Sequence, residues 1–378
     1  MSISPRLPSP STLAYLLLVL TAISGEYPSS LVARLPGGSS YKENVVKQLK
    51  REKLLRTFYR DGLRGLRLTA LAKSLLLQDQ PEQFRPYLTG STETNTLKSE
   101  VPRRLRLYRM AEVLTTMFNA GVPVFGWEKA LIFGDASIPL PIPLPAYYSS
   151  REFKELGSLT VKVRGSRAVG LLLAKSGVFA IYNTSSSLMK WEYRAEMRLK
   201  ALLQVELCNR RLAGLYRNAA IHGLVFGAGM ESLPGLMSNT RELRHNYFIL
   251  DGNYDAFHFL TSDHYGEVIL RLLCDPELRC LLDSILSENL RPKRGGFPIE
   301  HDALDEDGTP VLFAYTCDMP RIRRFDTALE LHGRSGTLIC FDHQEPALRQ
   351  VCGKQVRFQC IDFEKFEGSV FHIQKDAD

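Results

Sequence analysis

Hydrophobic positions near the N-terminus are spaced as in two short helices joined by a tight turn. The first pattern covers residues 28–35, and Gly37-Gly38 supplies the turn. The second pattern runs from Ser40 to about Lys53, and the spacing of Ser40 and Glu43 is that of a capping box, which predicts where this helix begins. Its apolar side consists of Val45, Val46 and Leu49.

Two further apolar-rich runs follow, over residues 54–59 and 63–68, with Asp61-Gly62 between them. This arrangement predicts a β-hairpin. Two helices and then a basic hairpin are the order of a winged helix-turn-helix, which presents its second helix to the DNA major groove and its hairpin to the flanking backbone. The residues that we expect to contact DNA are Tyr41, Lys42, Asn44, Lys47, Gln48, Lys50, Arg51, Arg60, Arg64 and Arg67.

The charge of the chain is concentrated in its first third. Residues 1–110 carry 18 Lys and Arg against 8 Asp and Glu, a net charge of +10, whereas the remainder carries 30 against 33. A local cationic field attracts polyphosphate and supports DNA binding through counterion release. A protein-interaction module with a solvated basic face would have the same charge, so this observation favours DNA without excluding a protein partner.

An apolar segment over residues 13–23 precedes the predicted helices. With Arg6 before it and Ser24-Gly25 after it, the segment resembles the core of a signal peptide. It is shorter than the roughly 20 residues that a membrane span needs. The alternative is the first helix of the winged domain, with Ser9 or Ser11 as N-cap, which would cover the core of that domain.

Residues 77–100 are polar and rich in turn formers, and a basic amphipathic helix is predicted over 97–120. This helix either packs on the winged domain or runs between domains, and the arginines at its start either contact phosphate or form a solvated face. Those arginines are Arg103, Arg104, Arg106 and Arg109. The expected division is a winged-helix DNA-binding domain over 1–78, a linker and connecting helix over 79–122, and an α/β domain over 123–378.

Strand and helix patterns alternate over residues 130–370, which predicts an α/β domain (α+β for the whole chain) with a mixed sheet. Helices are expected over 189–207, 230–237, 266–285 with a break near Pro276, and 345–351. Strands are expected over 130–133, 168–174, 177–182, 221–226, 246–250, 256–260, 309–315, 336–341 and 356–360.

Acidic residues do not have the spacing of a nuclease centre. Such a site needs an Asp on one strand and a Glu-x-Lys on the next, but the strand pair over 168–182 contains no acidic residue. Asp251, Asp255 and His258 stand close together, with His264 and Glu267 downstream, yet Asp251-Gly252-Asn253 is itself a turn sequence. We therefore expect no catalytic residue, metal or cofactor. Side chains that would serve a nuclease are Glu192, Glu196, Asp251 and Asp255.

The chain has seven cysteines, which is an odd number, and its sequence contains no CxxC motif and no Cys/His pairs at zinc spacing. This usage predicts reduced thiols and a cytoplasmic protein. No stretch after residue 30 approaches the length of a membrane span, so no membrane partner is expected.

The winged-helix pattern, closed by residues 66–76, resembles the winged domains of Gram-positive mobile elements. Followed by residues 103–118 and an α/β domain of this size, the layout resembles the replication-relaxation family of plasmid and conjugative-element proteins. Tyr182-Asn-Thr with Trp191-Glu192 is also similar to segments of proteins that such elements carry. The resemblance implies a second domain related to degenerate restriction-endonuclease-like folds.

The resemblance also implies a non-enzymatic DNA-binding protein of a mobile genetic element, acting in replication or conjugative transfer. Candidate partners are double-stranded DNA, a second copy of the chain (a homodimer), and a relaxase or replication protein. Two alternatives stay open. One is a metal-dependent nuclease that uses the second domain, and the other is a transcription regulator whose second domain senses a ligand.

Overall fold

The computed structural model describes residues 6–89, 100–133, 141–153, 165–238, 247–248, 250, 252–293 and 295–373. The chain forms two compact units. The N-terminal unit consists of residues 1–156 and 169–171, and the C-terminal unit of residues 157–168 and 172–378. Helices and mixed sheets together give an α/β protein overall, as the sequence predicts.

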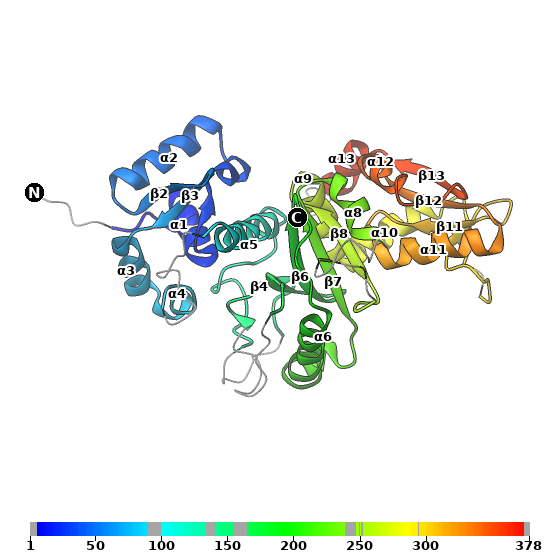
Figure 1. Ribbon diagram of the computed structural model, residues 1–378, viewed down its shortest axis with the longest axis horizontal. Coiled ribbons are helices and arrows are strands. Elements are labelled where there is room, and N and C mark those ends of the chain that lie inside the picture. The colour runs from blue at the N-terminus through cyan, green and yellow to red at the C-terminus, as the bar shows by residue number, and fades with distance from the viewer. Residues whose placement is uncertain are drawn as a thin grey trace, which may run out of the picture. The chain divides into compact units, whose positions relative to one another are not determined.

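The N-terminal unit contains a three-stranded antiparallel sheet of order β1-β3-β2 with helices around it (Figure 1). Its first elements are α1 (Leu13–Ser24), β1 (Tyr27–Pro28), the 3-10 helix η1 (Ser29–Arg34), α2 (Ser39–Arg51), β2 (Leu55–Arg60) and β3 (Leu63–Leu68). After them come α3 (Ala70–Asp79), α4 (Pro81–Leu88), α5 (Val101–Asn119) and β4 (Ala146–Ser149).

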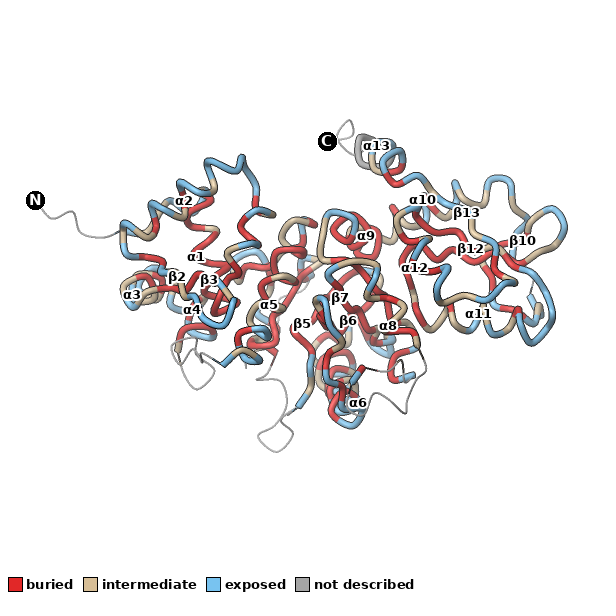
Figure 2. Tube along the Cα trace, turned by 45° about the horizontal axis from the view of Figure 1, so that its top comes forward, coloured by how far each residue is buried: buried red, intermediate tan, exposed pale blue. Residues whose placement is uncertain are grey.

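The apolar segment near the N-terminus forms α1, and every residue of this helix except Leu16 is buried (Figure 2). The helix contacts α2, α4 and α5 and so supplies the core of the unit. Its N-cap is Thr12, whose hydroxyl accepts a hydrogen bond from the backbone N–H of Tyr15 at 3.3 Å. Of the two interpretations of this segment, the structure has the helix, with Thr12 as cap in place of Ser9 or Ser11.

The predicted hairpin is confirmed. Arg60 pairs with Leu63, which leaves Asp61 and Gly62 as a two-residue turn between β2 and β3. Asp61 has a φ of 52° and Gly62 a φ of 75°. Positive φ at both central residues is what a type I′ turn needs, and Asp-Gly meets this requirement at low cost.

The predicted helix over 40–53 is confirmed as α2, but its predicted capping box is wrong. The helix begins at Ser39, one residue early, and its N-cap is Gly38, which has no side chain to bond. Ser40 therefore lies inside the first turn. The Glu43 carboxylate extends toward Lys47, 3.6 Å away, instead of reaching back to the N-terminus. Glycine is an acceptable N-cap residue, so the helix begins without the box.

Helix α5 belongs to the N-terminal unit and packs on α1. The sequence alone leaves open whether this helix joins the domain or bridges to the next one. Its inward side chains include Met110, Val113, Leu114 and Met117, each at most 5% exposed. The predicted start over 97–99 lies outside the described residues.

A sheet of order β4-β5-β6-β7-β8 is parallel from β6 to β8, and a second sheet of order β13-β12-β11-β10-β9 belongs to the C-terminal unit. Elements from β5 to α10 are β5 (Gly170–Ala174), β6 (Gly177–Ser185), α6 (Tyr193–Leu202), the π-helix η4 (Leu203–Arg211), α7 (Ala213–Tyr216), β7 (Ile221–Gly227), η5 (Met230–Ser232), α8 (Leu233–Met237), β8 (Phe257–Thr261), α9 (His264–Cys274) and α10 (Pro276–Leu286). The remaining elements are β9 (Arg291–Pro292), β10 (Ala303–Leu304), β11 (Pro310–Phe313), α11 (Met319–His332), β12 (Gly336–Phe341), η6 (Asp342–Gln344), α12 (Glu345–Leu348), β13 (Val356–Ile361) and α13 (Phe363–Ile373).

Most strands of this alternation are where the sequence predicts them, but two predictions are wrong. The described residues 130–133 are not in a strand, and the carbonyl of Ala130 instead accepts the hydroxyl of Tyr148 at 2.8 Å. The helix predicted from residue 189 begins only at Tyr193, because Lys190 pairs with Tyr247 in an isolated β-bridge. The strand predicted over 246–250 lies partly outside the described residues.

Candidate nucleic-acid interface

Helix α2 presents a polar side to solvent above a buried apolar side. Val45 is 6% exposed and Leu49 is fully buried, whereas Val46, which the sequence also assigns to the apolar side, is half-buried. We call those predicted DNA contacts of α2 that are exposed the α2 face: Tyr41, Asn44, Lys47, Gln48 and Arg51. These five side chains could meet a partner surface without a change in fold, and Asn and Gln are side chains that can read adenine.

Lys42 and Lys50, which the sequence grouped with the α2 face, are half-buried. The ammonium of Lys42 donates to the carbonyl of Ala33 at 2.6 Å and so ties α2 to η1. Burial lowers the pKa of Lys50, and the positive charge of Arg64 lowers it further. Lys42 therefore has a packing role, whereas Lys50 faces another cation.

The β2–β3 hairpin carries exposed cations near its tip. Arg60 and Arg64 are exposed as predicted, and the guanidinium of Arg60 lies 3.4 Å from the Asp61 carboxylate. Both members of that pair are more than half exposed, so the pair contributes little to stability. Arg56 and the 69% exposed Tyr59 also lie on the hairpin surface, although no sequence pattern singled them out.

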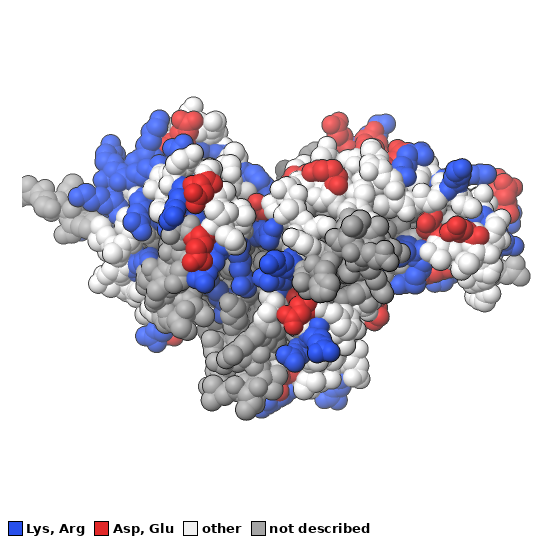
Figure 3. Space-filling model, viewed as in Figure 1, with Lys and Arg blue, Asp and Glu red and all other residues white. Residues whose placement is uncertain are grey.

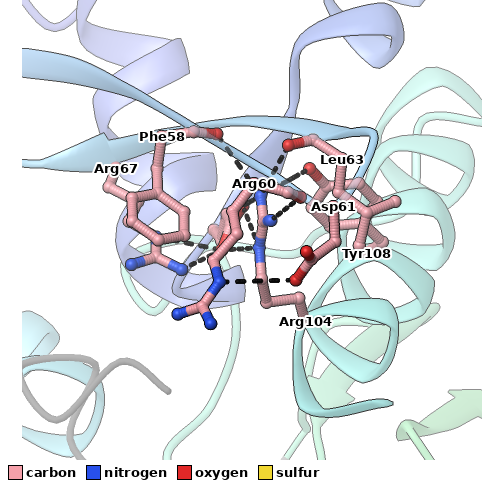
Figure 4. A network of polar contacts seen from close by, with 8 residues as sticks. Phe58, Arg60, Asp61, Leu63, Arg67, Arg104 and Tyr108 are labelled. Carbon is pink, nitrogen blue, oxygen red and sulfur yellow. Dashed lines mark hydrogen bonds and ion pairs between the residues drawn. The ribbon is translucent and has the colours of Figure 1, made fainter. Parts of the chain in front are cut away.

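Arg67 is not on the hairpin surface, which corrects its assignment as a DNA contact. Its side chain is 3% exposed, and its Nη2 lies 2.6 Å from Oε2 of Glu26. Arg104 of α5 is fully buried and binds the other carboxylate oxygen of Glu26 through its Nη2 at 2.5 Å. We call Glu26, Arg67 and Arg104 the buried triad, and Figure 4 labels its two arginines. The physical reason is that the buried carboxylate of Glu26 and the ring of Phe58 hold the Arg67 guanidinium inside the unit.

Arg104 also holds the hairpin by its backbone. Its Nη1 donates to the carbonyl of Arg60 at 2.8 Å, and its Nη2 to the carbonyl of Leu63 at 3.0 Å (Figure 4). These two residues flank the turn, so one side chain of α5 binds both ends of the turn. Burial lowers the pKa of Arg104, but the hydrogen bond and charge of Glu26 outweigh burial and raise it overall. The cation is therefore retained inside the unit.

The ring of Phe58 on β2 completes this arrangement. The guanidinium carbon of Arg67 lies 3.6 Å from the ring centroid, and that of Arg104 lies 4.7 Å from it. Cation–π attraction of this kind partly replaces the hydration that both arginines lose. Gly65 leaves the space that Glu26 fills, because a Cβ at Gly65 would lie 2.1 Å from the Glu26 Oε1. A glycine inside a predicted strand was the one sequence signal of this close approach.

A hollow of about 510 Å³ lies where η1, α2 and β3 meet. Lys47 and Lys50 of α2 and Arg64 of β3 line it, so the helix and the hairpin border one common space. We call this space the basic hollow. The surface around α2 is crowded with Lys and Arg side chains in Figure 3. Hydroxyls of η1 also line the hollow, and no sequence pattern predicted them there.

The acidic candidates of the C-terminal unit that the structure describes do not converge on a metal site. Glu196 is fully buried, and its carboxylate accepts hydrogen bonds from the backbone N–H of Arg167 and the hydroxyls of Ser166 and Tyr182, each at 2.8 Å. Burial raises the pKa of Glu196 despite these bonds. Asp251 lies outside the described residues. Among the residues that the structure describes, no three His, Cys, Asp or Glu side chains could hold a metal ion together.

The two histidines of that group have separate partners. His258 is buried, and its Nδ1 lies 3.2 Å from the carbonyl oxygen of Thr316. His264 lies 2.8 Å from a carboxylate oxygen of Glu367, and its Nδ1 is 3.9 Å from Glu267. These partners give each imidazole a structural contact.

Comparison with protein-family models, curated proteins and solved structures finds no match to this chain. The resemblance to replication-relaxation proteins therefore stays an expectation. No helix among the described residues is long and apolar enough to cross a membrane.

Proposed function

We propose that this protein binds double-stranded DNA through α2 and the β2–β3 hairpin, as a winged helix does. The observation that carries the proposal is the basic hollow, which both elements border with cations. In this arrangement the α2 face enters the major groove, and the hairpin follows the phosphate backbone beside it.

The residue types of the α2 face fit this role. Asn44 and Gln48 can form paired hydrogen bonds with adenine, while Lys47 and Arg51 can bind guanine or phosphate. In the free protein the Gln48 amide donates to Glu52 at 2.8 Å, an exposed bond that a base edge can replace. Arg60 and Arg64 on the hairpin supply contacts that do not depend on sequence.

The buried triad supports the same proposal because it fixes the hairpin before any partner binds. Arg104 holds the backbone on both sides of the turn. A hairpin that is already ordered loses less conformational entropy on binding than one that must be ordered by its partner.

The experiment is a salt titration of duplex binding by the full chain. Arg60→Gln with Arg64→Gln should weaken binding to every duplex and reduce the slope of log K against log salt by about one unit for each phosphate that the protein no longer neutralises. Arg85→Gln is the matched control, because Arg85 is an exposed cation of α4 in the same unit. An unchanged slope in the double variant, or an equally reduced slope in the control, would contradict the proposal.

The role that we propose is binding without cleavage, and the DNA of a mobile element is the target that the resemblance implies. Sequencing the DNA that co-purifies with the protein would identify the target. The alternative of a metal-dependent nuclease predicts cleavage of plasmid DNA with Mg²⁺ or Mn²⁺ that is abolished in Glu192→Ala or Asp255→Ala. Such cleavage would contradict the proposal of binding without cleavage and would identify the protein as a nuclease.

A further inference from the structure

The basic hollow carries more positive charge than the surrounding residues neutralise. Of the cations that line it, Lys47 has the carboxylate of Glu43 at 3.6 Å, and Lys42 is bound to a backbone carbonyl. Lys50 and Arg64 have no carboxylate within ion-pair distance anywhere in the described part of the chain. Glu43 is the one carboxylate among the residues that line the hollow, and it lies beside Lys47, so Lys50 and Arg64 face the same space without a carboxylate at ion-pair distance.

Partial burial makes this charge costly. Lys50 is half-buried, and both burial and the charge of Arg64 lower its pKa. Charges that share a partly desolvated space repel one another more than they would in water. An anion placed between Lys50 and Arg64 would turn this repulsion into two attractions.

A serine that lines the hollow also has a hydroxyl without a partner. Ser29 of η1 lines the hollow, and its Oγ is buried with no hydrogen-bond partner among the residues that the structure describes. A buried hydroxyl without a partner costs free energy, which a bound acceptor would recover. Ser29 and the two cations come from three different elements, so η1, α2 and β3 each contribute a polar residue to the hollow.

We propose that the basic hollow is a phosphate-binding site, in which Lys50 and Arg64 hold the oxyanion and the Ser29 hydroxyl, turned toward the hollow by rotation about χ1, donates to it. A phosphate offers several acceptor oxygens and at least one negative charge, which matches this set of donors. The hollow, at about 510 Å³, is larger than one phosphate and leaves room for the sugar attached to it. The proposed source of the phosphate is the backbone of duplex DNA, and this part of the inference rests on the proposed function. A free phosphate shares the same chemistry.

The first experiment uses duplexes in which one phosphate at a time is replaced by an uncharged methylphosphonate. Wild type should show one linkage whose neutralisation weakens binding by about tenfold, the worth of a charge-assisted contact. Lys50→Gln with Arg64→Gln should abolish the effect of that linkage and keep the effects of the others. Ser29→Ala, which does not change the charge, should reduce the effect of neutralising that linkage by a few fold. Arg85→Gln should leave this effect unchanged.

If every linkage has the same effect in wild type and in the double variant, the hollow holds no backbone phosphate and the inference is wrong. Circular dichroism and the thermal midpoint show whether each variant is folded, and Ser29→Ala tests the site even where the charge variants are unstable.

A second experiment titrates the protein with inorganic phosphate and follows the ³¹P line width. Broadening by wild type but not by the double variant, together with an absence of duplex binding, would assign the site to a free phosphate and reject the proposed function. Neither duplex binding nor phosphate broadening in wild type would reject both.

Discussion

Replacing Glu26 with Gln should destabilise the N-terminal unit strongly while leaving the volume of the side chain unchanged. Glu26 is fully buried, and it is the carboxylate that lies against both Arg67 and Arg104, which are 3% and 0% exposed. The variant keeps a hydrogen-bond acceptor but leaves two buried guanidinium groups facing each other without a counter-charge. Breaking a buried ion pair by removing one partner costs about 3–5 kcal/mol.

The assay is urea unfolding followed by tryptophan fluorescence. The chain has two tryptophans, Trp127 in the N-terminal unit and Trp191 in the C-terminal unit, so a Trp191→Phe background reports on the N-terminal unit. With a slope of about 2 kcal/mol per molar urea, a destabilisation of about 4 kcal/mol lowers the midpoint by about 2 M.

Glu43→Gln is the control for this measurement, because Glu43 and Lys47 form an exposed pair, 67% and 73% accessible. The control should cost less than about 1 kcal/mol. If Glu26→Gln shifts the midpoint no more than Glu43→Gln does, the buried triad does not stabilise the unit and the reasoning fails.

Asn44→Ala and Gln48→Ala should each change the sequence preference of DNA binding by about 1–3 kcal/mol at a base that the side chain reads. Selection from a random duplex library measures this preference. Equal binding of wild type and variants to all sequences would contradict base readout. Burial lowers the pKa of His258 to about 4, below the value of about 6.5 expected in the unfolded chain, so the unfolded state binds the proton first as pH falls. His258 should therefore lower the free energy of unfolding by about 1.4 kcal/mol per pH unit as pH falls from 6.5 toward 4. The difference in this free energy between wild type and His258→Gln should follow the same slope. A difference that does not depend on pH would contradict the prediction. Cys280 and Cys360 are both exposed, but Cys280 should react with a thiol reagent before Cys360 at pH 8. The reason is that burial and the Glu345 carboxylate raise the pKa of Cys360 to about 11. Peptide mass mapping of the labelled protein tests the order.

Signals that lie within a few residues of one another predicted much of the candidate interface. The spacing of Val45, Val46 and Leu49 predicted the buried side of α2, of which Val45 and Leu49 are buried and Val46 is half-buried, and Asp61-Gly62 predicted the turn of the hairpin. Both rest on local backbone geometry, which the rest of the fold did not override. The start of α2 was misplaced by one residue because a serine that can cap a helix is also stable inside its first turn.

The buried triad could not be predicted in this way. Glu26 lies 41 residues before Arg67 and 78 before Arg104, so their meeting depends on tertiary packing. A charged side chain in a short strand is usually exposed, and that expectation assigned Arg67 to the DNA surface. The basic hollow was missed for a related reason, because Ser29, Lys50 and Arg64 come together only when η1, α2 and β3 are folded.

The close approach of Gly65 to Glu26 restricts how this chain can accept substitutions. Any side chain at position 65 would need the volume that the Glu26 carboxylate occupies, since even a Cβ there lies 2.1 Å from Oε1. Removing Glu26 to make room would leave Arg67 and Arg104 buried without a counter-charge. Both arginines would therefore have to be replaced by neutral residues at the same time. Positions 26, 65, 67 and 104 therefore form a set that tolerates change only jointly. In a deep mutational scan, single substitutions at all four should be depleted together, while combined replacement by glutamine or apolar residues recovers folding.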